Sequence, residues 1–517
     1  MSQKNSVLKS SAFMALATML SRVFGLVREQ VIAYYYGAGL LVDAFNVAYR
    51  IPNLLRDLLA EGAFSSAFLA EFAKAKVDGK ESMRELFLQC FWILAALGLF
   101  YALGLIFFAK ELIFLYAPEY ELGSIEMQTT VTLLKIMAPF LMFMSLGAVA
   151  MAVLNTHKSF FLPAVSPVFF NLVSILMVVG AAKVSGSPSI EMLAWGVLLG
   201  GAVQFLVQVP SLLKHGFAFT RPTKIWGAAV KEVFRKLIPG LLSFSASQIN
   251  ILVNTILATS SGVGAVSWLS YAFRIFQLPL GIVGVSLGTS NQVYFSEKWK
   301  SGELQTAAKI LSESLFFSVS LMLFPCIFLV FFPSWPIEIL FERGRFTAND
   351  SQMTAHALFA YSFGLPFYGM HKILLPVFYT INRQKTALVV AVVSILINIA
   401  FAIAMVPKYG FFVLAWSSTI SIACHALLLY WLLPSKLFQK RNFFSSRQYV
   451  SFLALFFCLC GYFFALSEWL PQVSIAKIWW FFPLLVVPVG ILDLFLWLSG
   501  GPVIFIRKII LKWKKTS

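Results

Sequence analysis

The chain has 517 residues and a formal net charge of +18; 59% of the residues are apolar and 12% are charged. A soluble domain usually carries about 25% charged residues, so this composition and the mean hydropathy of +0.83 exclude an ordinary soluble protein. The chain is predicted to be an integral membrane protein.

The apolar runs have the length of membrane-spanning helices. A helix needs about 20 apolar residues to cross roughly 30 Å of hydrocarbon, whereas a β-barrel shows alternating segments of about ten residues. We predict an all-α polytopic membrane protein with fourteen transmembrane helices, at approximately 12–36, 40–72, 86–109, 129–154, 160–182, 188–213, 237–258, 265–295, 311–333, 353–380, 386–406, 411–433, 449–467 and 478–500. The first run continues through Arg22 without a cleavage site, so we interpret it as a helix and not as a signal peptide.

The distribution of Lys and Arg predicts the orientation. Most of them lie in the polar interruptions on the side of the two termini, for example in Lys214–Lys236 and Lys436–Arg447. Positive loops stay in the cytoplasm, so both termini are predicted to be cytoplasmic. This asymmetry explains most of the net charge, and nucleic-acid binding is not needed to account for it. The five cysteines all fall in apolar segments and are expected to be core residues, and the five histidines show no metal-binding spacing.

An internal repeat organises helices 1–12. The sequence AYRIPNL at 48–54 recurs as AFRIFQL at 272–278, and Asn155, Lys158 and Asn171 recur as Asn382, Lys385 and Asn398. We therefore predict two pseudo-symmetric six-helix lobes, 1–215 and 216–435, followed by helices 13 and 14 and a basic tail at 436–517. Transporters built from such repeats bind their substrate near the membrane midplane between the halves.

Several cations fall inside the predicted spans. An Arg at the centre of a helix costs roughly 2.5–3.5 kcal/mol if it faces lipid, so these side chains should face a cavity or a partner, unless they reach an interface. They are Arg22, Arg28, Arg50, Arg56, Lys135, Arg274 and Lys372.

Helical spacing separates these cations into two groups. Asp43, Asp57 and Glu61 share one stripe of helix 2 with Arg50, which predicts that Arg50 is neutralised there. Glu29 lies seven residues after Arg22 and can pair with it.

The second group has no acid on its own helix face. Arg56 lies beside Asn53 and Asn46, and Arg274 is the only charged side chain between 262 and 295. Arginines that are only partly matched by acids form a suitable site for a phosphate or pyrophosphate, which a guanidinium can bind through two parallel hydrogen bonds.

At these residues the sequence resembles the MurJ (MviN-type) lipid II flippases, within the multidrug/oligosaccharidyl-lipid/polysaccharide exporter superfamily. The matching stretches include SRVFGLVRE at 21–29, GAGLLVDAFNVAYRIPNLLRDLLAEGAFSSAF at 37–68, SWLSYAFRIFQLPLGIVGVSLGT at 267–289 and FERGRFTAND at 341–350. The resemblance implies a transporter, not an enzyme, that works by alternating access in the bacterial cytoplasmic (inner) membrane. Its substrate would be lipid II, the undecaprenyl-pyrophosphate-linked disaccharide-pentapeptide, moved from the inner to the outer leaflet for peptidoglycan synthesis.

The resemblance also implies roles for individual residues. The cavity arginines of the family fall on Arg22, Arg28, Arg56 and Arg274, its acid near the outer end of helix 2 on Asp43, and the Ser of its helix 8 pattern on Ser267. We add Asn53, which shares the polar face of Arg56, to this predicted substrate site. Helices 13 and 14 are expected to form an apolar groove for the polyprenyl tail. Lipid II, membrane lipids and the cell-wall synthesis machinery are the partners that the resemblance suggests.

Other functions stay open at this stage. No cofactor is expected. Helix 7 offers no carboxylate, which argues against a sodium site there. Coupling to protons or to the membrane potential stays open. Another exporter of the superfamily, for drugs or a different lipid-linked oligosaccharide, is the nearest alternative. A polyprenyl-pyrophosphate membrane enzyme would need a nucleophile and base beside Asp57 and Glu61, and none is apparent.

Overall fold

The computed structural model of the chain describes residues 2–53, 56, 63–157, 159–435, 437, 446–469 and 488. Within these ranges every regular element is helical. Eight helical segments of the described residues are long and apolar enough to cross a membrane: Lys80–Phe107, Ile125–Thr156, Phe161–Ser185, Ile190–Lys214, Leu304–Phe331, Gln384–Tyr409, Val413–Trp431 and Gln448–Glu468. The predicted all-α multi-pass membrane architecture is therefore confirmed, while the count of fourteen spans and the orientation stay predictions.

The chain packs as two compact units. The first comprises Met1–Ser267 together with Arg343–Thr347, and the second comprises Trp268–Glu342 and Ala348–Ser517. The predicted lobe boundary near residue 215 and this packing boundary differ, because the helix Ala228–Thr259 packs against a helix of the first unit, Ala63–Asp78. The predicted C-terminal segment 436–517 lies mostly outside the described residues.

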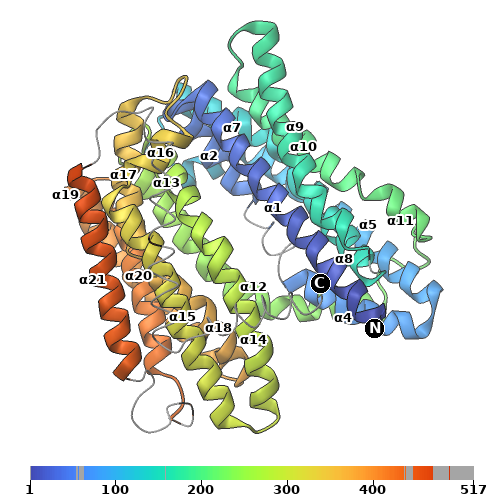
Figure 1. The fold of residues 1–517 in the computed structure, drawn as a ribbon. Coiled ribbons are helices and arrows are strands. Elements are labelled where there is room, and N and C mark those ends of the chain that lie inside the picture. The colour runs from blue at the N-terminus through green and yellow to red at the C-terminus, as the bar shows by residue number, and fades with distance from the viewer. Residues whose placement is uncertain are drawn as a thin grey trace. The chain divides into compact units, whose positions relative to one another are not determined.

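The first unit contains the helices up to residue 259. They are α1 (Ser2–Tyr36), α2 (Leu40–Asn53), α4 (Ala63–Asp78), α5 (Lys80–Phe107), α6 (Ala109–Tyr116), α7 (Ile125–Met137), α8 (Phe140–Thr156), α9 (Phe161–Ser185), α10 (Ile190–Leu206), α11 (Val209–Lys214) and α12 (Ala228–Thr259). Helix α9 packs against both α1 and α10, and α2 packs against α7 (Figure 1). A second layer of contacts joins α5 to α8 around a core rich in phenylalanine, including Phe68, Phe72 and Phe87.

The second unit contains the helices from α13 onward. Its elements are α13 (Ala265–Pro279, which begins in the first unit), the π-helix η1 (Leu280–Gly284), α14 (Val285–Lys300), α15 (Leu304–Phe331), α16 (Ser334–Leu340), α17 (Ala348–Ser362), α18 (Leu365–Thr380), α19 (Gln384–Tyr409), α20 (Val413–Trp431) and α21 (Ser446–Trp469). The pair α19 and α20 packs as α9 and α10 do, and α15 packs on α18 as α5 packs on α8. These matching pairs agree with the internal repeat in the sequence.

The ends of two equivalent helices show the same agreement in backbone detail. Helix α9 ends at Gly186, with φ of 74°, and α19 ends at Gly410, with φ of 86°. The left-handed conformation after a helix favours glycine, which has no Cβ to clash there. Each glycine stops its long apolar helix, and after a short turn the chain enters the next helix of the pair.

Candidate functional site

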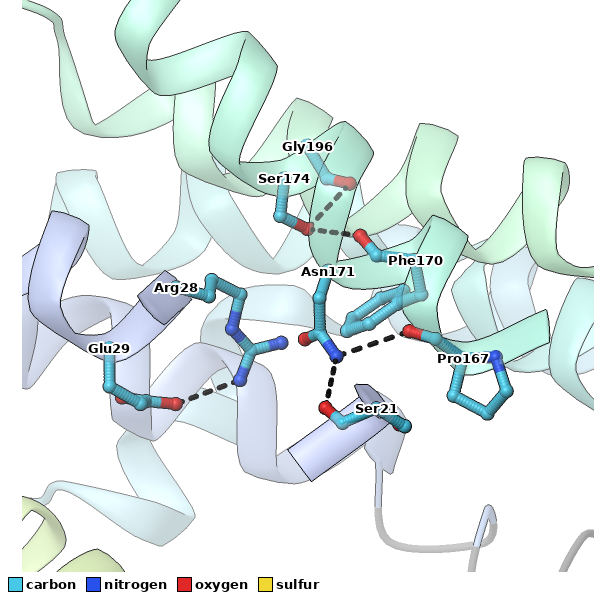
Figure 2. A network of polar contacts seen from close by, with 8 residues as sticks. All are labelled: Ser21, Arg28, Glu29, Pro167, Phe170, Asn171, Ser174 and Gly196. Atoms are coloured by element: carbon cyan, nitrogen blue, oxygen red, sulfur yellow. Dashed lines mark hydrogen bonds and ion pairs between the residues drawn. The ribbon is translucent and has the colours of Figure 1, made fainter. Parts of the chain in front are cut away.

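Arg28 of α1 is held in a largely desolvated position. Its guanidinium Nη2 donates to Glu29 Oε1 over 2.8 Å, and both side chains are only 12% exposed. The guanidinium carbon also lies 5.3 Å from the centre of the Phe170 ring on α9, within the range of a cation–π contact. The Nε of Arg28 is buried without a hydrogen-bond partner among the described residues. Figure 2 shows Arg28 reaching toward Glu29, with Phe170 and Asn171 beside it.

Asn171 fixes α9 against α1 next to this arginine. Its Nδ2 donates to the Ser21 carbonyl over 3.3 Å and to the Pro167 carbonyl over 3.1 Å. Pro167 has no N–H, so it cannot donate to the carbonyl of Pro163 one turn earlier. The Ser166 hydroxyl donates to that carbonyl instead, over 2.9 Å. Helix α9 therefore continues through its proline, and Phe170 and Asn171 are presented to α1.

Helix α10 supports α9 from its other side. The Ser174 hydroxyl donates to the Phe170 carbonyl over 3.0 Å and to the Gly196 carbonyl over 3.1 Å. A Cβ placed on Gly200 would lie 2.8 Å from the Phe170 carbonyl oxygen, so only glycine permits this approach of the two helices. Small residues bring transmembrane helices into such close contact. The backbone that carries Phe170 is thus held from two sides.

Arg22 lies two turns before Glu29 on α1 and is exposed. Glu29 pairs with Arg28, and Arg22 has no hydrogen bond or ion pair with any described residue. The expected pair of Arg22 with Glu29 is therefore absent. Two side chains seven residues apart start about 10 Å apart along the helix axis, whereas Arg28 reaches the carboxylate directly. The segment from Arg22 to Glu29 keeps a net positive charge.

Asp43 and Ser267, two residues of the predicted site, are in direct contact. One Asp43 oxygen accepts from the Ser267 backbone N–H over 2.7 Å and from the Ser267 hydroxyl, and the other accepts from the Gly264 backbone N–H. Asp43 is 4% exposed and Ser267 is fully buried. The carboxylate thus caps the start of α13, where free N–H groups and the helix dipole favour a negative charge.

Arg50 has a hydrogen-bond partner on another helix. It donates to the Thr255 hydroxyl on α12, and both oxygens of Asp43 are occupied by the start of α13. Asp57 and Glu61 lie outside the described residues. The predicted pairing of Arg50 with these acids therefore stays a prediction.

The remaining predicted residues are spread over both units. Asn53 is partly buried, and its Oδ1 has no hydrogen-bond partner. Arg56 is also partly buried. Arg274 is exposed on α13 in the second unit, and Lys135 and Lys372 are exposed on α7 and α18. The convergence of Arg22, Arg28, Arg56 and Arg274 on one ligand stays a prediction.

Four of the seven residues of the predicted site are arginines. In the part of the chain that the structure describes, no group of three or more His, Cys, Asp or Glu side chains could hold a metal ion. The sequence did not reveal the contribution of Phe170, because a cation–π contact between α1 and α9 produces no pattern in the sequence of either helix. Asn171 was visible only as a member of the repeat.

Comparison with known proteins gives a consistent result. The family model described as lipid II flippase MurJ matches residues 32–485. The lipid II flippase MurJ of Burkholderia cenocepacia is 36% identical over 434 residues, which cover 80% of this chain and 81% of the relative. The probable lipid II flippase MurJ of Buchnera aphidicola subsp. Schizaphis graminum is 33% identical over 438 residues, 84% of each chain.

Solved structures agree with these matches. A lipid II flippase MurJ in an inward closed conformation is similar with a TM-score of 0.76 and 25% identity, over 96% of this chain and 99% of that one. An inward-facing multidrug resistance transporter of the MATE family and MOP superfamily is similar with a TM-score of 0.67, over 81% of this chain and 96% of that one. Its identity is 12%, so this likeness concerns the fold alone.

Proposed function

The chain belongs to the MurJ family of lipid II flippases, and from this premise we propose that Arg22 and Arg28 bind the pyrophosphate of lipid II during its passage. The protein is a multi-pass membrane transporter that flips lipid II, and not an enzyme. Its role in peptidoglycan and cell-wall synthesis follows from that activity. Drug export and polyprenyl-pyrophosphate hydrolysis are not favoured.

The environment of Arg28 is the observation that carries the proposal. Its side chain is 12% exposed, it pairs with the Glu29 carboxylate, and its buried Nε has no acceptor among the described residues. A buried donor without a partner costs about 1–3 kcal/mol, and an anion with several oxygens can remove that cost. Arg22, one and a half turns away on the same helix, adds a charge without a carboxylate. The pyrophosphate matches this arrangement because a guanidinium can bind two of its oxygens at once.

Further residues are assigned to the same ligand. Arg56 and Arg274 are proposed as additional pyrophosphate ligands on the basis of the family pattern. Asn53 offers a buried acceptor, Oδ1, which suits an N–H or O–H group of the sugar or peptide and not a phosphate oxygen. Asp43 and Ser267 are proposed to act through their mutual contact, as a link between α2 and the start of α13 that forms and breaks during the transport cycle.

Substitutions at Arg28 test the pyrophosphate site. Arg28→Ala should bind undecaprenyl pyrophosphate at least about tenfold more weakly, because the loss of a charge-assisted contact costs roughly 1.5–3 kcal/mol, and should not flip fluorescent lipid II in proteoliposomes. Arg28→Lys should recover little, since an ammonium lacks the planar fork. Arg235→Ala, whose side chain is 79% exposed on α12, is the matched control. Full binding and flipping by a correctly folded Arg28→Ala protein would contradict the proposal.

The orientation of the chain determines the direction of transport. We propose that both termini and Lys214–Lys236 lie in the cytoplasm, that Glu111–Glu126 lies outside, and that lipid II moves from the inner to the outer leaflet of the cytoplasmic membrane. Single cysteines at Glu119 and Arg221, in a variant without the native cysteines, should react with an impermeant reagent in intact cells at Glu119 only. Reaction at Arg221 alone would reverse the topology.

The path of the lipid tail is proposed to follow helices 13 and 14, most of which lie outside the described residues. Truncation after Leu433 should leave a folded protein that no longer flips lipid II. Normal flipping by this truncated chain would exclude helices 13 and 14 from the mechanism. Contacts with membrane lipids and with the cell-wall synthesis machinery also stay predictions.

A further inference from the structure

Two histidine rings meet inside the second unit. His371 lies on α18 and His425 on α20, and their ring centres are 4.6 Å apart at an interplanar angle of 74°. Helix α20 is one of the apolar segments with the length of a membrane span. The rings are therefore a titratable pair within a membrane-spanning helix bundle, where ionisable groups are costly and usually functional.

Each ring has one nitrogen that lacks a partner. Nδ1 of His371 and Nε2 of His425 are buried, and neither has a hydrogen bond within the part of the chain that the structure describes. A buried polar atom of this kind costs about 1–3 kcal/mol, and an apolar pair would pack α18 against α20 without that cost. With the ring centres 4.6 Å apart, a small rotation brings nitrogens of the two rings to a hydrogen-bond distance of about 2.9 Å.

The charges around the pair come mostly from cations. The ammonium of Lys372, the next residue of α18, repels a positive charge on His371. Helices α18, α19 and α20 contain no acid. The acids on the other helices that pack against α18 or α20 are Glu297 on α14, Glu313 on α15 and Asp350 on α17. Glu313 pairs with Lys309, and Asp350 accepts from the Trp268 indole N–H. The other titratable side chains of these helices are Tyr294, Lys298, Lys300, Cys326, His356, Tyr361, Tyr368, Tyr379, Lys385, Lys408, Tyr409, Cys424 and Tyr430.

We propose that His371 and His425 form a proton-binding site of the second unit, which takes up one proton per pair and couples lipid II transport to pH. One added proton, taken from water, makes one ring an imidazolium that donates to the neutral ring beside it. The resulting N–H···N bond is charge-assisted. A second proton would place two cations in contact next to Lys372, so the pair holds one.

The pair responds to the conformation of its helices. In the packed arrangement no acid on α18 or α20 stabilises an imidazolium, so the neutral pair is favoured. An arrangement that admits water between α18 and α20 favours the protonated pair. If one arrangement of the helices binds the proton more tightly, proton binding increases the population of that arrangement. Histidine changes charge between about pH 5 and 8. The coupling part of this proposal rests on the flippase function, whereas proton binding does not.

Proton binding can be measured on the unmodified protein. In nanodiscs with a metal chelator and isotope-labelled histidine rings, NMR signals of His371 and His425 should change together, with one proton per pair, between about pH 5 and 8. Single His→Gln variants assign the signals, and His371→Gln should alter the titration of His425. Independent uptake of two protons, or no response of either signal across this range, would overturn the site. Signals that change only on addition of Zn²⁺ would make it a metal site and overturn it too.

Coupling is measured as flipping of fluorescent lipid II in proteoliposomes at zero membrane potential. The rate should depend on pH by up to about tenfold per unit, the dependence of a one-proton equilibrium. His371→Gln and His425→Gln should each lose this dependence, while His215→Gln should follow the unmodified protein. Equal pH profiles for all four proteins would refute the coupling. If the unmodified protein flips lipid II at no pH, with or without a membrane potential, the flippase function fails, and the NMR titration still decides the proton site.

Discussion

The contact of Asp43 with the start of α13 allows a quantitative prediction. The carboxylate accepts from three donors, the backbone N–H groups of Gly264 and Ser267 and the Ser267 hydroxyl. In Asp43→Asn, one oxygen can still serve Ser267, but an NH₂ group now faces the Gly264 N–H. The variant therefore loses one charge-assisted hydrogen bond and weakens two others, for a local cost of about 2–3 kcal/mol.

Hydrogen exchange measures this local cost. Each 1.36 kcal/mol corresponds to about a tenfold change, so the amides of Gly264 and Ser267 should exchange roughly 30- to 150-fold faster in Asp43→Asn. Amides of α9 around Ser174 should exchange at the original rate, because Ser174 is bound to Phe170 and Gly196. Asp78→Asn, at the exposed end of α4, is the control for the loss of one negative charge. Unchanged exchange at Gly264 in Asp43→Asn would refute the capping role of this carboxylate.

Four further substitutions test the packing and charges of the first unit. Gly200→Ala should lower the melting temperature by an amount equivalent to about 1–3 kcal/mol, because its Cβ would meet the Phe170 carbonyl. Gly104 has open space around it, so Gly104→Ala should raise the melting temperature, since alanine favours a helix over glycine by about 0.5–1 kcal/mol. Glu71→Gln should cost about 1 kcal/mol in the same assay, since its two lysine partners are partly exposed. Glu29→Gln should tighten binding of undecaprenyl pyrophosphate about tenfold or more and slow flipping, because Arg28 then lacks its competing carboxylate; unchanged affinity would show that Glu29 does not compete with the ligand.

Hydrophobic periodicity and charge predicted the helical class correctly because both depend on local sequence. The apolar runs exceed the length of the bilayer, and the repeat of Asn171 as Asn398 marks equivalent helices that pack alike. The packing boundary at Ser267 was not predictable in this way. A sequence repeat identifies equivalent helices, whereas a packing boundary depends on which helices are in contact. Helix α12 contacts α4 of the first unit.

The candidate site shows the same limit at the level of single residues. Helical spacing placed Asp43 near Arg50, because it compares only residues of one helix. The donors that Asp43 binds lie on Gly264 and Ser267, 221 and 224 residues away. Likewise, Arg28 was assigned to the site by its unusual place in an apolar run, but its support by Phe170 is a contact between distant helices. Sequence identifies which charges need partners, and the fold decides what those partners are.

The proposed role of Arg28 requires an arginine that can both bind and release a pyrophosphate. A guanidinium fully matched by acids would have little affinity for another anion, and one buried with no compensation would hold a pyrophosphate too tightly to release it. Here one carboxylate, Glu29, offsets the charge, and the face of Phe170 stabilises a cation by about 0.5–2 kcal/mol without occupying its N–H groups. In the proposed site, the donors of Arg28 that Glu29 does not occupy would bind the anion, and Glu29 would keep the arginine paired after the anion leaves. Because a ligand shifts a conformational equilibrium only by its difference in affinity for the two states, this exchange of partners allows binding and release at a moderate and reversible energetic cost.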